Sequence, residues 1–283
     1  MSIFESFEKK HDYLICVDSD GCVMDTMNCK HFRCFGPCMV TQWGLDAWKD
    51  EILVRWNVIN LFSMTRGINR FKGLAIALGE INEKYLPIEG IAYLQHWADT
   101  APALSNDAIA AAATNADCAA AKTVFEKALS WSKAVNASIA ELPEDLKVPY
   151  DGAKEGLAVA HTFADVAMVS SANRDAVEEE WCKFGLLKYT DIVLAQDIGS
   201  KAACIAEMLK FDYDPSKVLM IGDAPGDCEA AEKNGVWYYP ILVNHEKASW
   251  DEVITTAFNK LQSGEYAEYG IQKKKEFLAN LGG

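Results

Sequence analysis

Acidic and hydroxyl side chains recur in this sequence directly after short apolar segments. Asp18 and Asp20 follow one such segment in YLICVDSDG, and Asp223 and Asp227 follow another in GDAPGD. Two carboxylates from different strands could hold a hard cation such as Mg²⁺, which prefers oxygen ligands. A carboxylate beside that cation could attack phosphorus and form an acyl phosphate, while a second one, two residues on, could transfer protons. Ser170, Ser171 and Asn173 follow another such segment, and Lys201 lies past a further one, at the start of a predicted helix.

Phosphoryl transfer is the chemistry that suits this set. The cation, the lysine and a hydroxyl could share the charge on a phosphoryl group's oxygens. Each feature alone is weak, because aspartate is a common turn residue after a strand. The set therefore gains its meaning only if the fold brings its members to one place.

The apolar segments themselves predict a parallel sheet. They are short and do not alternate, as expected of strands buried on both faces. Helical patterns separate the later segments, and this spacing builds right-handed crossovers and a doubly wound, Rossmann-like α/β sheet. Ligands bind such a sheet at the carboxyl ends of its strands, so we expect the side chains above at one edge. The predicted strands are 13–17, 166–169, 192–195, 218–221 and 236–243, and the later helices are 174–184, 200–210 and 226–233.

The interval 28–147 has a different character, because its patterns are helical and it shows no strand pattern. We therefore predict an all-helical domain at 28–147, inserted into an α/β core made of 1–27 and 148–246. Residues 247–283 are predicted to form a C-terminal helical extension packed on the core. One continuous α/β domain with long crossovers is the alternative. Within the insert, helices are expected at 45–63, 68–85, 106–121 and 123–142, and the last predicted strand, with Pro240, is expected toward a sheet edge.

Composition excludes several classes of partner. The formal net charge of −14 argues against nucleic acid and anionic membranes, which require a basic face. The sequence has no apolar run of about twenty residues and no secretory signal at its start. Nine cysteines, an odd number without framework spacing, favour free thiols in a reducing compartment, so we predict a cytoplasmic protein. The sequence carries no signal for the oligomeric state.

The ordered motifs resemble the haloacid dehalogenase superfamily. They are D-x-D-G-x-x-x-D after the first strand, serine after the second, then lysine, then G-D-x-x-x-D. The resemblance covers 12–27 and 148–243, and the insert has the position and character of the C1 cap found in phosphatases similar to phosphoglycolate phosphatase and β-phosphoglucomutase. Cys22 stands where the family usually has threonine, a position that mainly shapes the turn.

The resemblance implies a role for each matching residue. Asp18 would be the nucleophile, and Asp20 the general acid and base, with its backbone carbonyl on Mg²⁺. Ser170, or Ser171 if the strand ends one residue later, would bind the phosphoryl group. Lys201 would neutralise that group and steady Asp18. The acidic metal ligands implied are Asp18 and Asp223, with Asp227 further out or acting through water.

The sequence thus predicts a Mg²⁺-dependent phosphatase that hydrolyses a small phosphorylated metabolite through an aspartyl phosphate. Within the superfamily that the sequence resembles, an acid at the position of Asp20 implies an oxygen leaving group and not dehalogenation. The alternatives are a sugar phosphomutase and a non-catalytic phosphate-binding or regulatory module. Arg66 and Arg70, in TRGINRFKG, are candidates for substrate specificity together with Asn173, although solvated surface is the default for such arginines.

Three further features have more ordinary readings. Asp25 is expected to be structural. Cys29, His31, Cys34 and Cys38 could suggest zinc, but they lack the C-x-x-C pair of structural zinc sites, so a loop with buried thiols is favoured. Lys273, Lys274 and Lys275 are expected on a solvated face.

Overall fold

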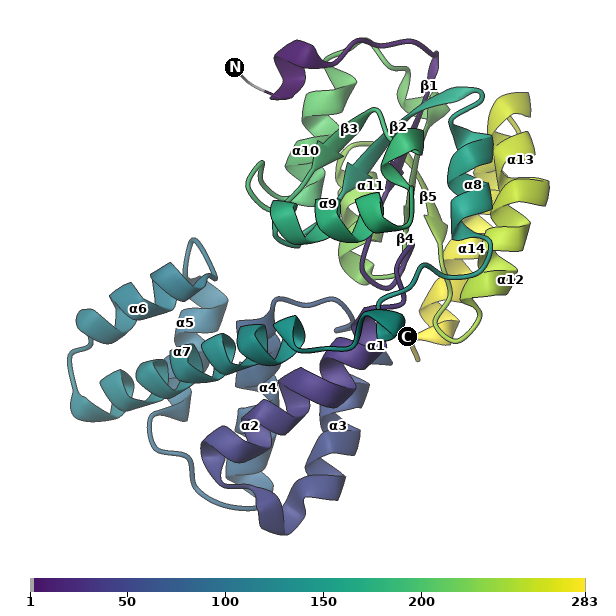
Figure 1. Ribbon diagram of the computed structural model, residues 1–283. Helices are drawn as coiled ribbons and strands as arrows, with labels where there is room; N and C mark the ends of the chain where they lie inside the picture. Colours follow the sequence, from purple (N-terminus) through teal and green to yellow (C-terminus); the bar gives the residue numbers. More distant parts are fainter. Residues whose placement is uncertain (1–2, 283) are drawn as a thin grey trace. The chain divides into compact units, whose positions relative to one another are not determined.

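The computed structural model describes residues 3–282, which form two compact units (Figure 1). One unit, here the α/β domain, combines residues 1–27 with 144–283, and the other, here the helical domain, is Asn28–Pro143. The insert lies between the first and second strands of a five-stranded parallel sheet, so the predicted fold class is confirmed. None of the helices in residues 3–282 is long and apolar enough to cross a membrane.

The sheet has the strand order β3-β2-β1-β4-β5 and all its pairs are parallel. Strand β1 lies at the centre, where Val17 pairs with Met168 on one side and with Ile221 on the other. The last strand is at an edge, where the absence of a donor on Pro240 costs no internal ladder bond, as predicted. The strands are β1 (Tyr13–Val17), β2 (Ala164–Val169), β3 (Ile192–Leu194), β4 (Val218–Gly222) and β5 (Trp237–Pro240).

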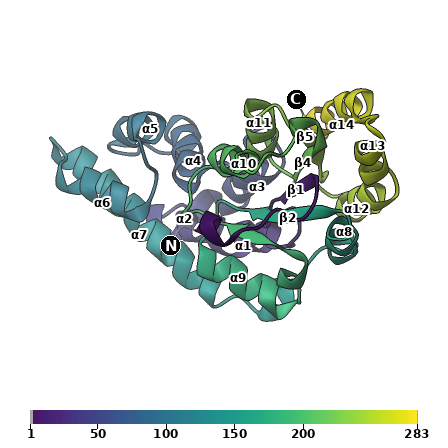
Figure 2. The same ribbon diagram turned by 90° about the horizontal axis from the view of Figure 1, so that it is seen from above.

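Helices cover both faces of this sheet, which explains why its strands are almost wholly buried. In Figure 2, α8 lies with α12, α13 and α14 on one side of the sheet, and α10 lies with α11 on the other. The helices of this domain are α8 (Ala153–Ala160), α9 (Arg174–Lys183), α10 (Lys201–Leu209), α11 (Pro225–Lys233), α12 (Glu246–Glu252), α13 (Phe258–Ser263) and α14 (Tyr266–Asn280). A π-helical stretch, η7 (Val253–Ala257), joins α12 to α13, and short 3-10 turns are η1 (Ile3–Ser6), η4 (Glu144–Leu146), η5 (Leu187–Tyr189) and η6 (Pro215–Lys217).

The prediction that Lys273, Lys274 and Lys275 lie on a solvated face is wrong for Lys273. This side chain is buried, with Nζ 2.7 Å from a Glu252 oxygen and 2.5 Å from a Glu276 oxygen. A buried ammonium requires such paired acids, because an unpaired charge is costly to remove from water. Lys273 therefore stabilises α14 against α12.

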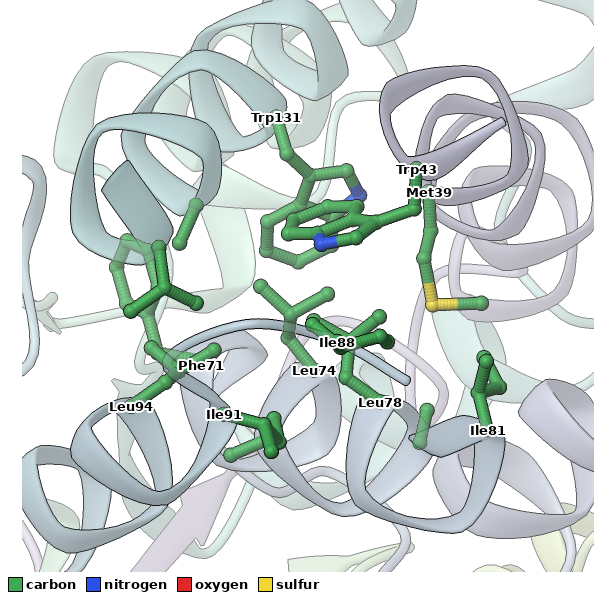
Figure 3. Packing of buried hydrophobic residues seen from close by; sticks show 14 of the residues in the cluster. Met39, Trp43, Phe71, Leu74, Leu78, Ile81, Ile88, Ile91, Leu94 and Trp131 are labelled. Carbon is green, nitrogen blue, oxygen red and sulfur yellow. The ribbon is translucent and has the colours of Figure 1, made fainter. Parts of the chain in front are cut away.

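The helical domain packs around a single apolar core. Its longest helix buries positions three and four apart, including Val124, Ala128, Trp131 and Val135, which is the period of an amphipathic helix. Figure 3 shows the Trp131 and Trp43 rings above Leu74 and Leu78. The helices are α1 (Met27–Lys30), α2 (Gly36–Trp43), α3 (Lys49–Leu61), α4 (Arg70–Lys84), α5 (Ile91–Thr100), α6 (Asn106–Thr114) and α7 (Ala119–Ala140), with a π-helical stretch η2 (His31–Phe35) and a 3-10 turn η3 (Asp46–Trp48).

Three sequence expectations for the helical domain need correction. The predicted helix 106–121 ends at Thr114, because Cys118 caps a new helix through a hydrogen bond that its sulfur accepts from Ala121 N. Helix α5 was not predicted. The expected loop of buried thiols after residue 28 is helical instead, running through α1, η2 and α2.

Candidate active site

Parallel register brings the ends of four strands to one edge of the sheet. The Asp18 amide donates to the Ile221 carbonyl at 3.0 Å, and the Ser170 amide donates to the Leu194 carbonyl at 2.9 Å. Asp18 follows β1, Ser170 follows β2 and Asp223 follows β4, while Lys201 begins the helix after β3. The predicted edge is thus observed.

Lys201 is at the centre of an ion-pair cluster. Its Nζ lies 2.8 Å from an Asp18 oxygen and 2.5 Å from an Asp227 oxygen. Ser200 caps α10 by accepting a hydrogen bond from Ala203 N, and this fixes the start of the helix on which the lysine is carried. An ammonium that contacts two carboxylates at once can do so in few side-chain conformations, so Lys201 is held in one position.

Asp227 is held as tightly as Lys201. While Oδ1 accepts from Lys201, Oδ2 accepts from the backbone amides of Asp223 at 3.2 Å and Ala224 at 3.0 Å. Gly222 makes this approach possible, since a Cβ there would overlap the Asp227 carboxylate. Both oxygens of Asp227 are therefore engaged by the protein, which suits it to orient Lys201 and the turn that carries Asp223.

One ligand oxygen from each of Asp18, Asp223 and Asp227 lies within 4.8 Å of the others, and all three residues are buried. With Lys201 as the one ammonium against three carboxylates, the cluster has a formal net charge of −2. Burial of so much uncompensated charge is unfavourable, and a bound cation would relieve it. The donor set fits a hard divalent cation, which prefers carboxylate oxygens.

Burial and the neighbouring opposite charges shift the pKa values of Asp18 and Lys201 in opposite directions. Burial raises the pKa of Asp18 well above its usual value, and Lys201 opposes that shift. Burial also lowers the pKa of Lys201, but the carboxylates of Asp18 and Asp227 outweigh it and leave the net pKa raised. Lys201 is accordingly a firmly protonated cation, and any further positive charge beside Asp18 would favour its ionised form.

A tight turn presents Asp18 and Asp20. Gly21 has φ +87°, a left-handed conformation that costs glycine little. The Ser19 carbonyl accepts from the amides of Val23 and Met24, both at 2.9 Å, which closes the turn. Asp20 accepts a short hydrogen bond from the Thr26 hydroxyl. The Asp20 carboxylate is therefore oriented by its own loop.

Two neighbours of the turn are fixed by contacts with backbone carbonyls. The Asp25 amide donates to the Val148 carbonyl at 2.8 Å, which ties the loop to the returning chain. The Cys22 thiol is buried and contacts the Ile221 carbonyl, so a small side chain suffices at that position.

The two serines after β2 differ in their exposure to solvent. Ser170 is buried and its Oγ accepts from Ala172 N at 3.1 Å, whereas Ser171 is exposed. Asn173 uses its side chain to cap α9, where it accepts from Ala176 N at 3.3 Å. Of the three polar side chains after β2, Ser170 is the one at the buried edge with Asp18.

The two candidate arginines lie in the helical domain in unlike settings. Arg66 is buried, and its guanidinium donates to the Leu61 carbonyl at 2.8 Å. Arg70 donates to Asn136 Oδ1 at 2.7 Å and Ser132 Oγ at 3.0 Å, with its guanidinium over the Phe35 ring. Burial lowers the pKa of Arg70. Arg66 is thus buried with its guanidinium on a backbone carbonyl, while Arg70 is a partly buried cation held by neutral groups.

The candidate zinc residues do not form a metal-ligand group in the described chain, residues 3–282. The Trp56 indole donates to His31 Nδ1 at 3.2 Å, and the His31 ring stacks on Phe35. His31 is part of an aromatic cluster, which explains its type without a metal.

Sequence reasoning missed three side chains that contact the Asp18–Asp20 turn. Thr26 orients Asp20, Trp181 donates to Ser19 Oγ, and Trp250 donates to the Cys22 carbonyl. A hydroxyl six residues after Asp20 could have been noticed in DGCVMDT. The tryptophans could not, because they lie 162 and 228 residues from their acceptors and no spacing rule connects them.

Comparison with known proteins adds family-level information. A family model described as haloacid dehalogenase-like hydrolase matches residues 96–239. No curated protein matches the chain. Among solved structures, a protein from Lactobacillus delbrueckii subsp. bulgaricus named as a phosphoglycolate phosphatase matches with TM-score 0.53 and 13% identity over 82% of this chain and 86% of its own. A protein from Thermotoga maritima named as a β-phosphoglucomutase matches with TM-score 0.51 and 14% identity over 87% of this chain and 99% of its own. At these identities the likeness concerns the fold.

Proposed function

The chain belongs to the haloacid dehalogenase-like hydrolases, and we propose that it is a Mg²⁺-dependent phosphatase acting on a small phosphorylated metabolite. The observation that carries the proposal is the buried cluster in which Lys201 contacts both Asp18 and Asp227. It combines a carboxylate nucleophile with a fixed ammonium at the carboxyl edge of the sheet, where α/β folds bind ligands.

Asp18 is the proposed nucleophile. Its carboxylate attacks phosphorus, a new O–P bond forms, and the bond to the ester oxygen breaks. Asp20 donates a proton to the departing alcohol and then removes one from the water that hydrolyses the aspartyl phosphate. The Thr26 hydrogen bond supports this assignment, because a proton-transferring group must hold a fixed orientation.

Ser170 and Lys201 are the proposed phosphoryl-binding groups. The ammonium of Lys201 can neutralise oxygens that gain charge in the transition state, and it is already fixed before substrate arrives. Ser170 can donate its hydroxyl proton to a phosphoryl oxygen while its own oxygen accepts from Ala172 N. The exposed Ser171 is the weaker candidate for this role.

Asp18, the Asp20 carbonyl and Asp223 would hold Mg²⁺. When bound, the cation would withdraw charge from phosphoryl oxygens and neutralise the acidic cluster. Asp227 we assign to positioning rather than ligation, since its two oxygens already accept from Lys201 and two backbone amides.

The helical domain, Asn28–Pro143, is proposed to act as the cap that supplies specificity. Arg70 is the specificity candidate that we retain, because its guanidinium is pre-oriented by Ser132 and Asn136 and pairs with no carboxylate among residues 3–282. Arg66 and Asn173 are better explained by their structural hydrogen bonds. All nine cysteines are free thiols, which supports a reducing location such as the cytoplasm.

Hydrolysis of p-nitrophenyl phosphate with and without Mg²⁺ tests the proposal. We expect turnover by the wild type that is abolished by chelation and by Asp18→Asn. Asp212→Asn is the matched control, because Asp212 is an exposed aspartate in the turn before β4, at the end of that strand opposite Asp223. It should retain full activity.

A panel of phosphorylated metabolites, scored by kcat/KM, would then identify the substrate class. If no ester in the panel released phosphate in the presence of Mg²⁺, the enzyme assignment would be wrong. If a second sugar phosphate discharged the aspartyl phosphate faster than water, the protein would be a mutase instead.

A further inference from the structure

Two buried indoles contact the turn that carries Asp18 and Asp20 from different elements. Trp181, on α9, donates from Nε1 to Ser19 Oγ at 2.8 Å. Trp250, on α12, donates from Nε1 to the Cys22 carbonyl at 3.0 Å. Both indoles and both acceptor residues are fully buried. Water therefore does not compete for these two hydrogen bonds.

These contacts reach the parts of the turn next to the reacting carboxylates. Ser19 lies between Asp18 and Asp20, and Cys22 lies two residues past Asp20. The Ser19 carbonyl closes the turn from within by accepting from Val23 and Met24. The indoles add anchors from outside the turn, one to a side-chain oxygen and one to a backbone carbonyl.

Trp250 is itself firmly held. The preceding residue, Ser249, accepts from the Tyr239 hydroxyl through its carbonyl at 3.1 Å and from Leu242 N through its Oγ at 3.0 Å. The ring lies against Gly156 of α8, where an added Cβ would be 2.5 Å from it. The glycine leaves room for the indole, and the packing leaves the ring no space to turn away from Cys22.

We propose that Trp250 is a positioning residue for the phosphatase reaction, with Trp181 as its counterpart on the other helix. The proposal rests on the proposed function. Trp250 lies beyond residues 96–239, the segment that the family model matches. The proposal therefore gives the C-terminal extension a role in positioning the catalytic turn. Catalytic groups must stay within about 0.5 Å of their productive positions. Misplacement by about 1 Å costs about a hundredfold in rate.

The alternative is that Trp250 only fills the core. Trp250→Phe separates the two, because phenylalanine keeps a buried ring but has no N–H for the Cys22 carbonyl. The matched control is Trp237→Phe, which removes an indole hydrogen bond to another backbone carbonyl, that of Ser216 at 2.9 Å, before β4 and away from the turn. Trp181→Phe provides a second variant of the proposed kind.

Steady-state kinetics with p-nitrophenyl phosphate and Mg²⁺ form the first arm of the test. For Trp250→Phe we expect kcat to fall about ten- to a hundredfold, with KM within about twofold of the wild type. Trp181→Phe should show the same split, and Trp237→Phe should retain the wild-type kcat. A merely structural role would lower the melting temperature without this selective loss of kcat.

Amide hydrogen exchange forms the second arm and does not depend on turnover. In Trp250→Phe the amides of Val23 and Met24 should exchange faster, while Trp237→Phe leaves them protected. A folded Trp250→Phe protein with wild-type kcat and unchanged exchange would overturn the proposal. If the wild type hydrolyses no ester, the proposed function fails, and with it the catalytic purpose of the anchor. Faster exchange in Trp250→Phe would then show that the Trp250 hydrogen bond stabilises the turn but has no role in catalysis.

Discussion

Replacing Lys201 by methionine should destabilise the α/β domain strongly and lower kcat. Methionine keeps an unbranched side chain of similar length but removes the only ammonium in the Asp18–Asp223–Asp227 cluster. The formal charge of that cluster changes from −2 to −3. The change tests whether electrostatic balance, rather than packing, holds the site together.

The magnitude follows from the two ion-pair distances, 2.8 Å and 2.5 Å. With an effective dielectric constant of about 20, each contact is worth about 6 kcal/mol before desolvation is subtracted. Desolvation of a buried ammonium offsets much of this, and loss of one partner of a buried pair typically costs about 3–5 kcal/mol. For a domain of this size that corresponds to a drop in melting temperature of about 6–20 °C. Loss of one preorganised positive donor should lower kcat about a hundred- to a thousandfold.

Thermal unfolding and kinetics with p-nitrophenyl phosphate measure both effects. Lys217→Met is the matched control, because Lys217 forms a 3.3 Å ion pair with Asp12 at the surface, and exposed pairs contribute about 1 kcal/mol or less. Mg²⁺ should raise the melting temperature of Lys201→Met more than that of the wild type, since the variant site is more negative. A Lys201→Met protein that melts like Lys217→Met and gains nothing from Mg²⁺ would refute the electrostatic reasoning.

Three further predictions concern thiols, pH and the helical domain. Iodoacetamide should modify the exposed Cys182 in the native protein and spare Cys204 and Cys228, whose pKa values burial raises to about 11; mass spectrometry showing equal modification would contradict this. Burial raises the pKa of Asp191, but Lys10, the Val166 amide and His161 outweigh it and hold that pKa below its usual value. The resulting stability is present at neutral pH and is lost as the pH falls below about 4. The advantage of wild type over Asp191→Asn in urea unfolding should therefore shrink in that range, and a constant difference would disprove it. Arg70→Met should cost the helical domain about 1–3 kcal/mol, because Ser132 and Asn136 lose a charged donor; unchanged urea unfolding would rule this out.

Much of the fold could be predicted from local patterns. The five strands could be located because buried parallel strands are continuous apolar runs. Such a run can be recognised in the sequence without knowing which strand pairs with it. Helix α5 was missed because IAYLQHWADT begins after Gly90 and carries no side-chain cap. The buried setting of Lys273 was missed because three consecutive lysines suggest solvent, while the acids that pair with one of them lie at Glu252 and Glu276.

The sequence by itself determined which chemical groups are present and that strand ends deliver them to one edge. The positions of Asp18, Ser170 and Asp223 after apolar runs, and of Lys201 at the start of a helix, could be read from the sequence because they are local properties. Only the tertiary structure decided that Asp227 is occupied by Lys201 and two backbone amides, that the Arg66 guanidinium donates to the Leu61 carbonyl, and that Trp181 and Trp250 contact the turn. Those facts depend on distances between side chains far apart in the chain. A hydrogen bond extends only about 3 Å, so its partners are set by packing and not by spacing in the sequence.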